Sequence, residues 1–113
     1  MLFTRSLKQN HEFKRLYYRG KSASGASVAV YCLKNKREYN RLGLTVGSKL
    51  GCAVVRNRTR RRMRECYRTH ERELKPGYDI VIVARTRAVT DGYPAIERDI
   101  CAGLARLGIL VAS

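Results

Sequence analysis

The fold is decided by residues 42–84, which read LGLTVGSKLGCAVVRNRTRRRMRECYRTHERELKPGYDIVIVA. Apolar residues alternate with other residues over 42–46, which is the period-two pattern of a strand. A long helix is expected over 53–74, because a Pro-Gly pair follows it and would end it. The β-branched run 78–84 then predicts a second, well-buried strand. A strand, a long helix and another strand therefore form the centre of the predicted fold.

Two helices and one more strand are expected outside this centre. A short helix is predicted over 10–19, a strand over 28–33, and a last helix over 94–107 with apolar residues at intervals of three and four. The Gly- and Ser-rich segment 20–27 and the polar segment 85–93 are expected to be links. The order of helix, strands, long helix, strand and helix predicts an α+β fold with helices packed on one sheet.

The composition indicates a single domain, residues 1–113, with an anionic partner. A chain of 113 residues with 44% hydrophobic content can form one core and is too short for two ordinary domains. The 24 Lys and Arg against 9 Asp and Glu leave a formal charge of +15, which a polyanion would neutralise. Nucleic acid is therefore the leading class of partner.

An anionic membrane surface is the other polyanion to consider. The longest apolar runs, 28–33 and 80–84, fall far short of the roughly 20 residues that a spanning helix needs. The first residues, 1–5, lack the apolar segment of a secretory signal. We therefore expect no membrane partner and a location in the cytoplasm.

The expected long helix contains the densest positive charge in the chain. Six of the nine residues from 56 to 64 are arginine. At about 100° per residue one face of this helix is apolar, and the opposite face is polar and basic. The apolar face consists of Val55, Thr59, Met63, Cys66 and Leu74. The basic face consists of Asn57, Arg60, Arg64 and Arg68, with Arg61 beside it.

Arginine suits a nucleic-acid partner because its planar guanidinium pairs bidentately with phosphate and stacks on bases. The alternative is an ordinary solvated helix face. Such a face usually mixes Glu with Lys at i, i+4 spacing, whereas only Glu65 interrupts the basic cluster here. The pattern therefore favours contact with RNA or DNA.

The sequence offers no evident catalytic or metal site. His11 and His70 have no paired Cys, Asp or His at the spacing that metal ligands use. The four cysteines are Cys32, Cys52, Cys66 and Cys101. They form no Cys-x-x-Cys pair, and although two disulfides are possible on paper we expect reduced thiols. Glu65, Glu71 and Glu73 stand among arginines and are expected to form surface ion pairs. We therefore expect no metal ligand and no catalytic residue in this chain.

One segment resembles a known family. Residues 46–64, VGSKLGCAVVRNRTRRRMR, are similar to the signature of the bacterial ribonuclease P protein component. The resemblance covers nearly the whole chain and includes Leu7-Lys8, Phe13, Gly20-Lys21, Tyr31 and residues 78–85. It implies a ribosomal-protein-S5-domain-2-like fold of order αβββαβα with a left-handed β-α-β crossover, against the usual right-handed rule. The residue pattern itself indicates three strands, and we expect the family's remaining strand between Tyr39 and Ala53.

The resemblance also implies what the residues do. The helix that begins with Arg-Asn-Arg would contact the catalytic RNA subunit through Arg56, Asn57, Arg58, Arg60, Arg61, Arg64 and Arg68. A neighbouring cleft would take the single-stranded 5′ leader of precursor tRNA, at positions that match Phe13, Tyr17 and Tyr31. Catalysis would belong to the RNA and its bound magnesium, with one protein per RNA assisting precursor binding at low magnesium.

Alternatives remain open for the aromatic residues and for the whole protein. Phe13, Leu16 and Tyr17 could simply fix the first helix to the core. Tyr31 is ambiguous because its strand neighbours point to the other face, so one face could be core and the other cleft. For the whole chain, a ribosomal protein and a DNA-binding regulator are the rivals. A ribosomal protein would give no reason for the Arg-Asn-Arg signature. A DNA-binding regulator would be expected to prefer duplex DNA over structured RNA.

Overall fold

The computed structural model describes residues 4–111. The strands are β1 (Thr4–Ser6), β2 (Lys21–Ser24), β3 (Val28–Lys34), β4 (Asn40–Thr45) and β5 (Tyr78–Ala84). The helices are α1 (Asn10–Arg19), α2 (Ala53–His70), α3 (Thr86–Thr90) and α4 (Tyr93–Arg106), with short 3-10 turns η1 (Ser48–Leu50) and η2 (Glu71–Glu73). The expected lack of a secretory signal rests partly on residues 1–3, which lie outside the described residues.

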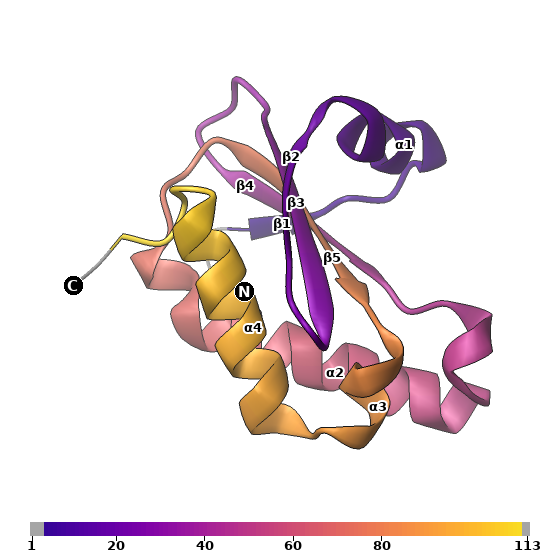
Figure 1. Cartoon of the computed structure of the whole chain (residues 1–113). Helices are drawn as coiled ribbons and strands as arrows, with labels where there is room; N and C mark the ends of the chain where they lie inside the picture. Colours follow the sequence, from indigo (N-terminus) through magenta and orange to yellow (C-terminus); the bar gives the residue numbers. More distant parts are fainter. Residues whose placement is uncertain (1–3, 112–113) are drawn as a thin grey trace.

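The strands form one mixed sheet in the order β1-β4-β5-β3-β2. β4 and β5 are parallel neighbours, with Leu42 opposite Ile80, whereas β3 pairs antiparallel with β5 and with β2. Parallel neighbours need a crossover connection, and α2 provides it, as can be followed in Figure 1. This unit is the strand, helix and strand predicted from residues 42–84.

Helices cover both faces of the sheet, and β3 shows how the sequence assigns the faces. Val30 and Cys32 of β3 belong to the larger core, together with Met63 of α2 and Ile100 of α4. Tyr31 alternates to the opposite face and joins the smaller cluster beneath α1. Figure 1 accordingly shows α1 on one side of the sheet and α2 with α4 on the other. The two faces of this strand therefore pack against different apolar clusters, and Tyr31 lies on the side covered by α1.

The predicted α+β order is confirmed, but one strand lies elsewhere than expected. The elements α1, β2, β3, β4, α2, β5 and α4 reproduce the order αβββαβα. The strand sought between Tyr39 and Ala53 is β2, which lies within the segment expected to be a Gly- and Ser-rich link. Its residues, KSAS, lack an apolar run because this is an edge strand in which only Ala23 is buried. Its conformation comes from pairing with β3, which the local pattern does not reveal.

Three smaller differences separate the structure from the predicted elements. β1 is a three-residue edge strand that pairs with β4, too short to show a period. α3 is a helix of five residues within the segment expected to be a polar link, anchored by the buried Ala88. α2 ends at His70 rather than near Leu74, because Leu74 forms a β-bridge with Leu110 and must be extended there.

Candidate nucleic-acid interface

α2 presents an arginine-rich surface because its apolar stripe is turned into the core. Thr59, Met63, Cys66 and Tyr67 are the buried residues of this helix. The first three were predicted for the apolar face, and Tyr67 was not. Its hydroxyl lies 2.9 Å from Thr4 Oγ1, so the buried phenol has a hydrogen-bond partner. The predicted basic residues are exposed or half-buried: Arg56, Asn57, Arg58, Arg60, Arg61, Arg64 and Arg68.

Most of these arginines keep their charge available for a partner. Arg60 Nη1 donates a hydrogen bond to Asn57 Oδ1 at 2.9 Å, and that acceptor is neutral. Arg68 forms an ion pair with Glu65, and the hydrogen bond from Arg68 lowers the pKa of Glu65. Five of the six arginines form no ion pair with any carboxylate among residues 4–111: Arg56, Arg58, Arg60, Arg61 and Arg64. The basic surface is therefore largely unneutralised within the described chain.

Two tyrosines lie together on the α1 side of the sheet. The rings of Tyr17 and Tyr31 meet edge to face, with centroids 5.0 Å apart and planes at 76°. The hydroxyl of Tyr17 lies 3.0 Å from Thr45 Oγ1, which fixes the ring position, and Tyr17 is 41% exposed. Tyr31 is half-buried. Both rings are held in place and both retain exposed surface that could stack on a base.

Phe13 connects this side of the sheet to α2. Its ring lies against Gly43 of β4 so closely that a Cβ at Gly43 would be 2.5 Å from Phe13 Cζ. A hollow extends from this ring to α2, and the residues that line it are Ser6, Leu7, Phe13, Leu42, Gly43, Leu44, Arg60 and Arg64. The structure thus brings together Phe13 and two arginines that the sequence singled out separately. The other predicted arginines do not line this hollow.

A second hollow contains basic residues that the sequence analysis did not single out. Lys49, Arg85 and Arg87 line it together with Thr45 and Val83, where β4 and β5 end. The carboxyl ends of parallel strands meet at one edge of a sheet. Because the three basic residues follow two predicted strands, their gathering at this edge could have been predicted. Because Thr45 also contacts the Tyr17 hydroxyl, this basic hollow adjoins the aromatic residues.

A buried ionic network positions α1 over the sheet. Asp79 of β5 is only 1% exposed and accepts hydrogen bonds from Arg41 Nε at 2.8 Å and Nη2 at 2.7 Å. Arg41 also forms an ion pair with Glu12 of α1, and the hydrogen bond to Asp79 raises the pKa of its guanidinium. Removing one partner of such a pair typically costs about 3–5 kcal/mol. The network therefore holds the helix that supplies Phe13 and Tyr17.

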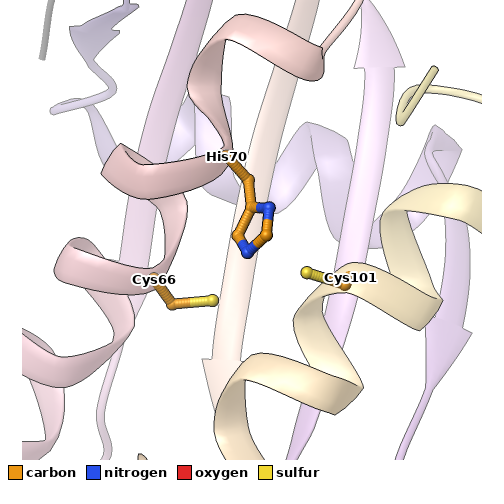
Figure 2. Close-up of side chains that lie close together, drawn as sticks. All are labelled: Cys66, His70 and Cys101. Carbon is orange, nitrogen blue, oxygen red and sulfur yellow. The ribbon is translucent and has the colours of Figure 1, made fainter. Parts of the chain in front are cut away.

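A thiol and imidazole cluster joins α2 to α4. The expectation that His70 has no paired cysteine is wrong, because the ligand atoms of Cys66, His70 and Cys101 all lie within 4.8 Å of one another (Figure 2). Cys66 and His70 are four residues apart on α2, a spacing that puts them on one face and could have been noticed. Cys101 comes from α4, and only the tertiary structure brings it to the other two.

These features together define a class of protein. A chain of charge +15, with an arginine-rich helix beside partly exposed aromatic rings on a mixed sheet, is typical of a small RNA-binding protein. Among residues 4–111, no helix combines the length and apolar character needed to cross a membrane.

The particular family follows from similarity to known proteins. The family model described as Ribonuclease P matches residues 1–108. The chain is 40% identical over 98 residues to the ribonuclease P protein component of Clostridioides difficile, covering 86% of each. It is 41% identical over 91 residues to that of Alkaliphilus metalliredigens, covering 80% of this chain and 82% of the relative. The chain belongs to the bacterial ribonuclease P protein family.

Solved structures agree with this assignment. The Staphylococcus aureus RNase P protein superposes with a TM-score of 0.85 at 31% identity, covering 93% of this chain and 96% of that one. The Thermotoga maritima RNase P protein superposes with a TM-score of 0.77 at 27% identity, covering 85% of this chain and 91% of that one. The αβββαβα order implied by the resemblance is therefore the fold of this family.

Proposed function

We propose that this chain is the protein subunit of ribonuclease P, binding the catalytic RNA through α2 and the 5′ leader of precursor tRNA through Phe13, Tyr17 and Tyr31. The main support is the hollow in which Phe13 meets Arg60 and Arg64. Single-stranded RNA is bound by aromatic faces that stack on bases beside a basic groove that follows the backbone. Phe13 supplies the aromatic face, and Arg60 and Arg64 supply the basic groove, in a single hollow.

The arginine surface of α2 and the aromatic side of the sheet would bind different RNA segments. The exposed arginines of α2 that face away from the aromatic residues would bind structured RNA through its phosphates, with the bidentate geometry that guanidinium allows. Arg60 and Arg64 would lie where the two RNA segments approach each other, because they line the same hollow as Phe13. Lys49, Arg85 and Arg87 would extend the basic surface along the aromatic side.

Hydrolysis itself is assigned to the RNA subunit and the magnesium that the RNA binds. Phosphodiester cleavage by a protein typically uses carboxylates that hold two metal ions near the scissile phosphate. We assign no such role to any residue of this chain. The chain would instead increase precursor affinity and allow cleavage at lower magnesium, with one protein per RNA, in the cytoplasm where precursor tRNA is made.

Reconstitution tests the proposal directly. The purified chain is mixed with a bacterial ribonuclease P RNA, and removal of the leader from a precursor tRNA is followed as magnesium is lowered. Correct cleavage is expected at magnesium concentrations where the RNA alone is slow. Cleavage by the protein without RNA would contradict the assignment of catalysis to the RNA. No effect of the protein on the RNA-catalysed reaction would contradict the proposed function as a whole.

A further inference from the structure

The cluster between α2 and α4 has the donors of a metal site. Cys66 and His70 stand one turn apart on α2, and Cys101 faces them from α4, with all three ligand atoms within 4.8 Å of one another. Figure 2 shows both sulfur atoms and the edge of the imidazole ring directed toward a common space. Cys66 is buried, while His70 and Cys101 are half-buried, so the space lies just beneath the surface.

Two glutamates complete the arrangement. Glu97, one turn before Cys101 on α4, places Oε2 3.1 Å from His70 Nε2. Glu73 of η2 places Oε1 2.7 Å from the other ring nitrogen, Nδ1. An imidazole that binds a metal through one nitrogen usually donates its other N–H to a carboxylate, which fixes the tautomer and the ring orientation. Glu73 stands in that supporting position. Glu97 contacts the ring nitrogen that would bind the metal, so its carboxylate is close enough to turn toward the ion as a fourth ligand.

We propose that Cys66, His70, Cys101 and Glu97 form a structural zinc site that fastens α2 to α4, with Glu73 as a positioning residue. Two thiolates, one imidazole and one carboxylate are ligands that Zn²⁺ accepts in tetrahedral geometry. Soft thiolates favour zinc over magnesium or calcium, which prefer oxygen ligands. With four protein ligands the site is closed, which is typical of structural rather than catalytic zinc.

The distances fit after a small closure. Zn–S bonds of about 2.3 Å and Zn–N bonds of about 2.0 Å put tetrahedral ligand atoms roughly 3.3–3.8 Å apart. The ligand atoms of Cys66, His70 and Cys101, now within 4.8 Å of one another, need to approach by on the order of 1 Å. The Glu97 carboxylate, now 3.1 Å from His70 Nε2, must turn from that nitrogen toward the same space. Rotation about the side-chain bonds of Cys101 and Glu97, which are only half-buried, provides that movement without a change in the helices.

The charges at this place also suit a cation. Burial, together with the neighbouring Cys101 and Glu97, raises the pKa of the Cys66 thiol to about 12. A divalent ion would take the place of the two thiol protons, and its positive charge would also offset the carboxylates of Glu73 and Glu97 beside His70. Metal binding should accordingly release protons.

Metal binding to the isolated chain tests this inference without any RNA. The reduced, metal-free protein is titrated with Zn²⁺ and, separately, with Co²⁺, whose absorption reports thiolate ligands and tetrahedral geometry. We expect one ion per chain with a dissociation constant on the order of 10 nM or tighter, and a zinc-dependent rise in melting temperature. The Co²⁺ complex should show sulfur-to-cobalt charge transfer.

Variants at half-buried positions keep the test interpretable if Cys66 variants fail to fold. Cys101→Ser and His70→Gln should each weaken Zn²⁺ binding at least a hundredfold, and Glu73→Gln about 10–100-fold with the cobalt spectrum otherwise retained. Cys52→Ser is the matched control, because Cys52 is exposed and lies outside the cluster, and it should bind like the parent. Binding weaker than micromolar, a cobalt complex without thiolate absorption, or equal affinity in Cys101→Ser would overturn the proposal.

Discussion

The double substitution Arg60→Ala with Arg64→Ala tests whether α2 binds RNA. Arg60 is half-buried and its side chain donates to the neutral amide of Asn57, and Arg64 is exposed. Neither forms an ion pair with a carboxylate among residues 4–111, so their removal leaves no buried charge unpaired. Alanine also has the higher helix propensity. The double variant should therefore fold with little change in melting temperature.

The expected loss appears in the salt dependence of binding. Each phosphate contact contributes about 0.7–0.9 to the slope of log affinity against log salt, so two lost contacts should reduce the slope by about 1.4–1.8. A fourfold rise in salt should then weaken the parent roughly 7- to 12-fold more than the double variant. Titrations of ribonuclease P RNA at several salt concentrations, read by filter binding or fluorescence, measure this difference.

A charge-matched control separates specific contact from the general effect of net charge. Both residues chosen for the control are exposed. Lys75 follows the C-terminal end of α2, Arg106 lies at the end of α4, and neither lines the hollow beside Phe13. The variant with both changed to Ala loses the same two charges and should keep a slope close to that of the parent. An unchanged slope in a folded Arg60 and Arg64 variant, or an equal reduction in the control, would refute RNA contact by these two residues.

Three further predictions concern the aromatic residues and the docking of α4. Tyr31→Ala should weaken binding of leader-bearing precursor about tenfold to a hundredfold more than binding of mature tRNA, as loss of a stacked base implies; equal losses with a large fall in melting temperature would indicate core packing instead. Gly43→Ala should displace the Phe13 ring, since its Cβ would lie 2.5 Å from Cζ, and should cost about 1–3 kcal/mol in thermal unfolding while weakening precursor binding. Asp99 accepts hydrogen bonds from Ser27 N at 2.8 Å and Oγ at 2.6 Å, and although burial acts in the opposite direction, these bonds lower its pKa. Its stabilising effect is thus present above the unfolded value of about 3.9 and is lost as pH falls through the folded value. Asp99→Asn should therefore destabilise by roughly 1–3 kcal/mol at pH 7, and its difference from the parent should shrink as pH falls through the folded pKa.

The local pattern was sufficient wherever an element is long or deeply buried. The apolar stripe of α2 and the β-branched run of β5 gave the correct element types, and the alternation in β3 assigned Tyr31 to the face opposite Val30. In these segments, burial requires a period that matches the backbone geometry. The period is then visible in the residues themselves.

The pattern failed where conformation depends on a distant partner. β2 is a strand because its backbone pairs with β3, although its residues have the polar character of a loop. The end of α2 is set by the bridge between Leu74 and Leu110, which are far apart in sequence. Neither the pairing of β2 with β3 nor the bridge that ends α2 can be recognised from the neighbouring residues in the sequence.

The sequence by itself determined the class of this protein. The net charge, the arginine cluster from 56 to 64 and the order of the main elements are properties of the chain alone, and they indicated a nucleic-acid partner and the identity of the basic surface. The resemblance of residues 46–64 to a known signature indicated the family. Side-chain chemistry and helical or strand periodicity are local, so they can be recognised before the chain folds.

Only the tertiary structure decided which side chains share a site. It placed Phe13 in one hollow with Arg60 and Arg64, and it brought Cys101 to the cysteine and histidine of α2. These distances depend on the pairing of β4 with β5 and on how α4 packs against α2. Such contacts join residues separated by tens of positions, and they are fixed by the burial of a common core rather than by any local preference.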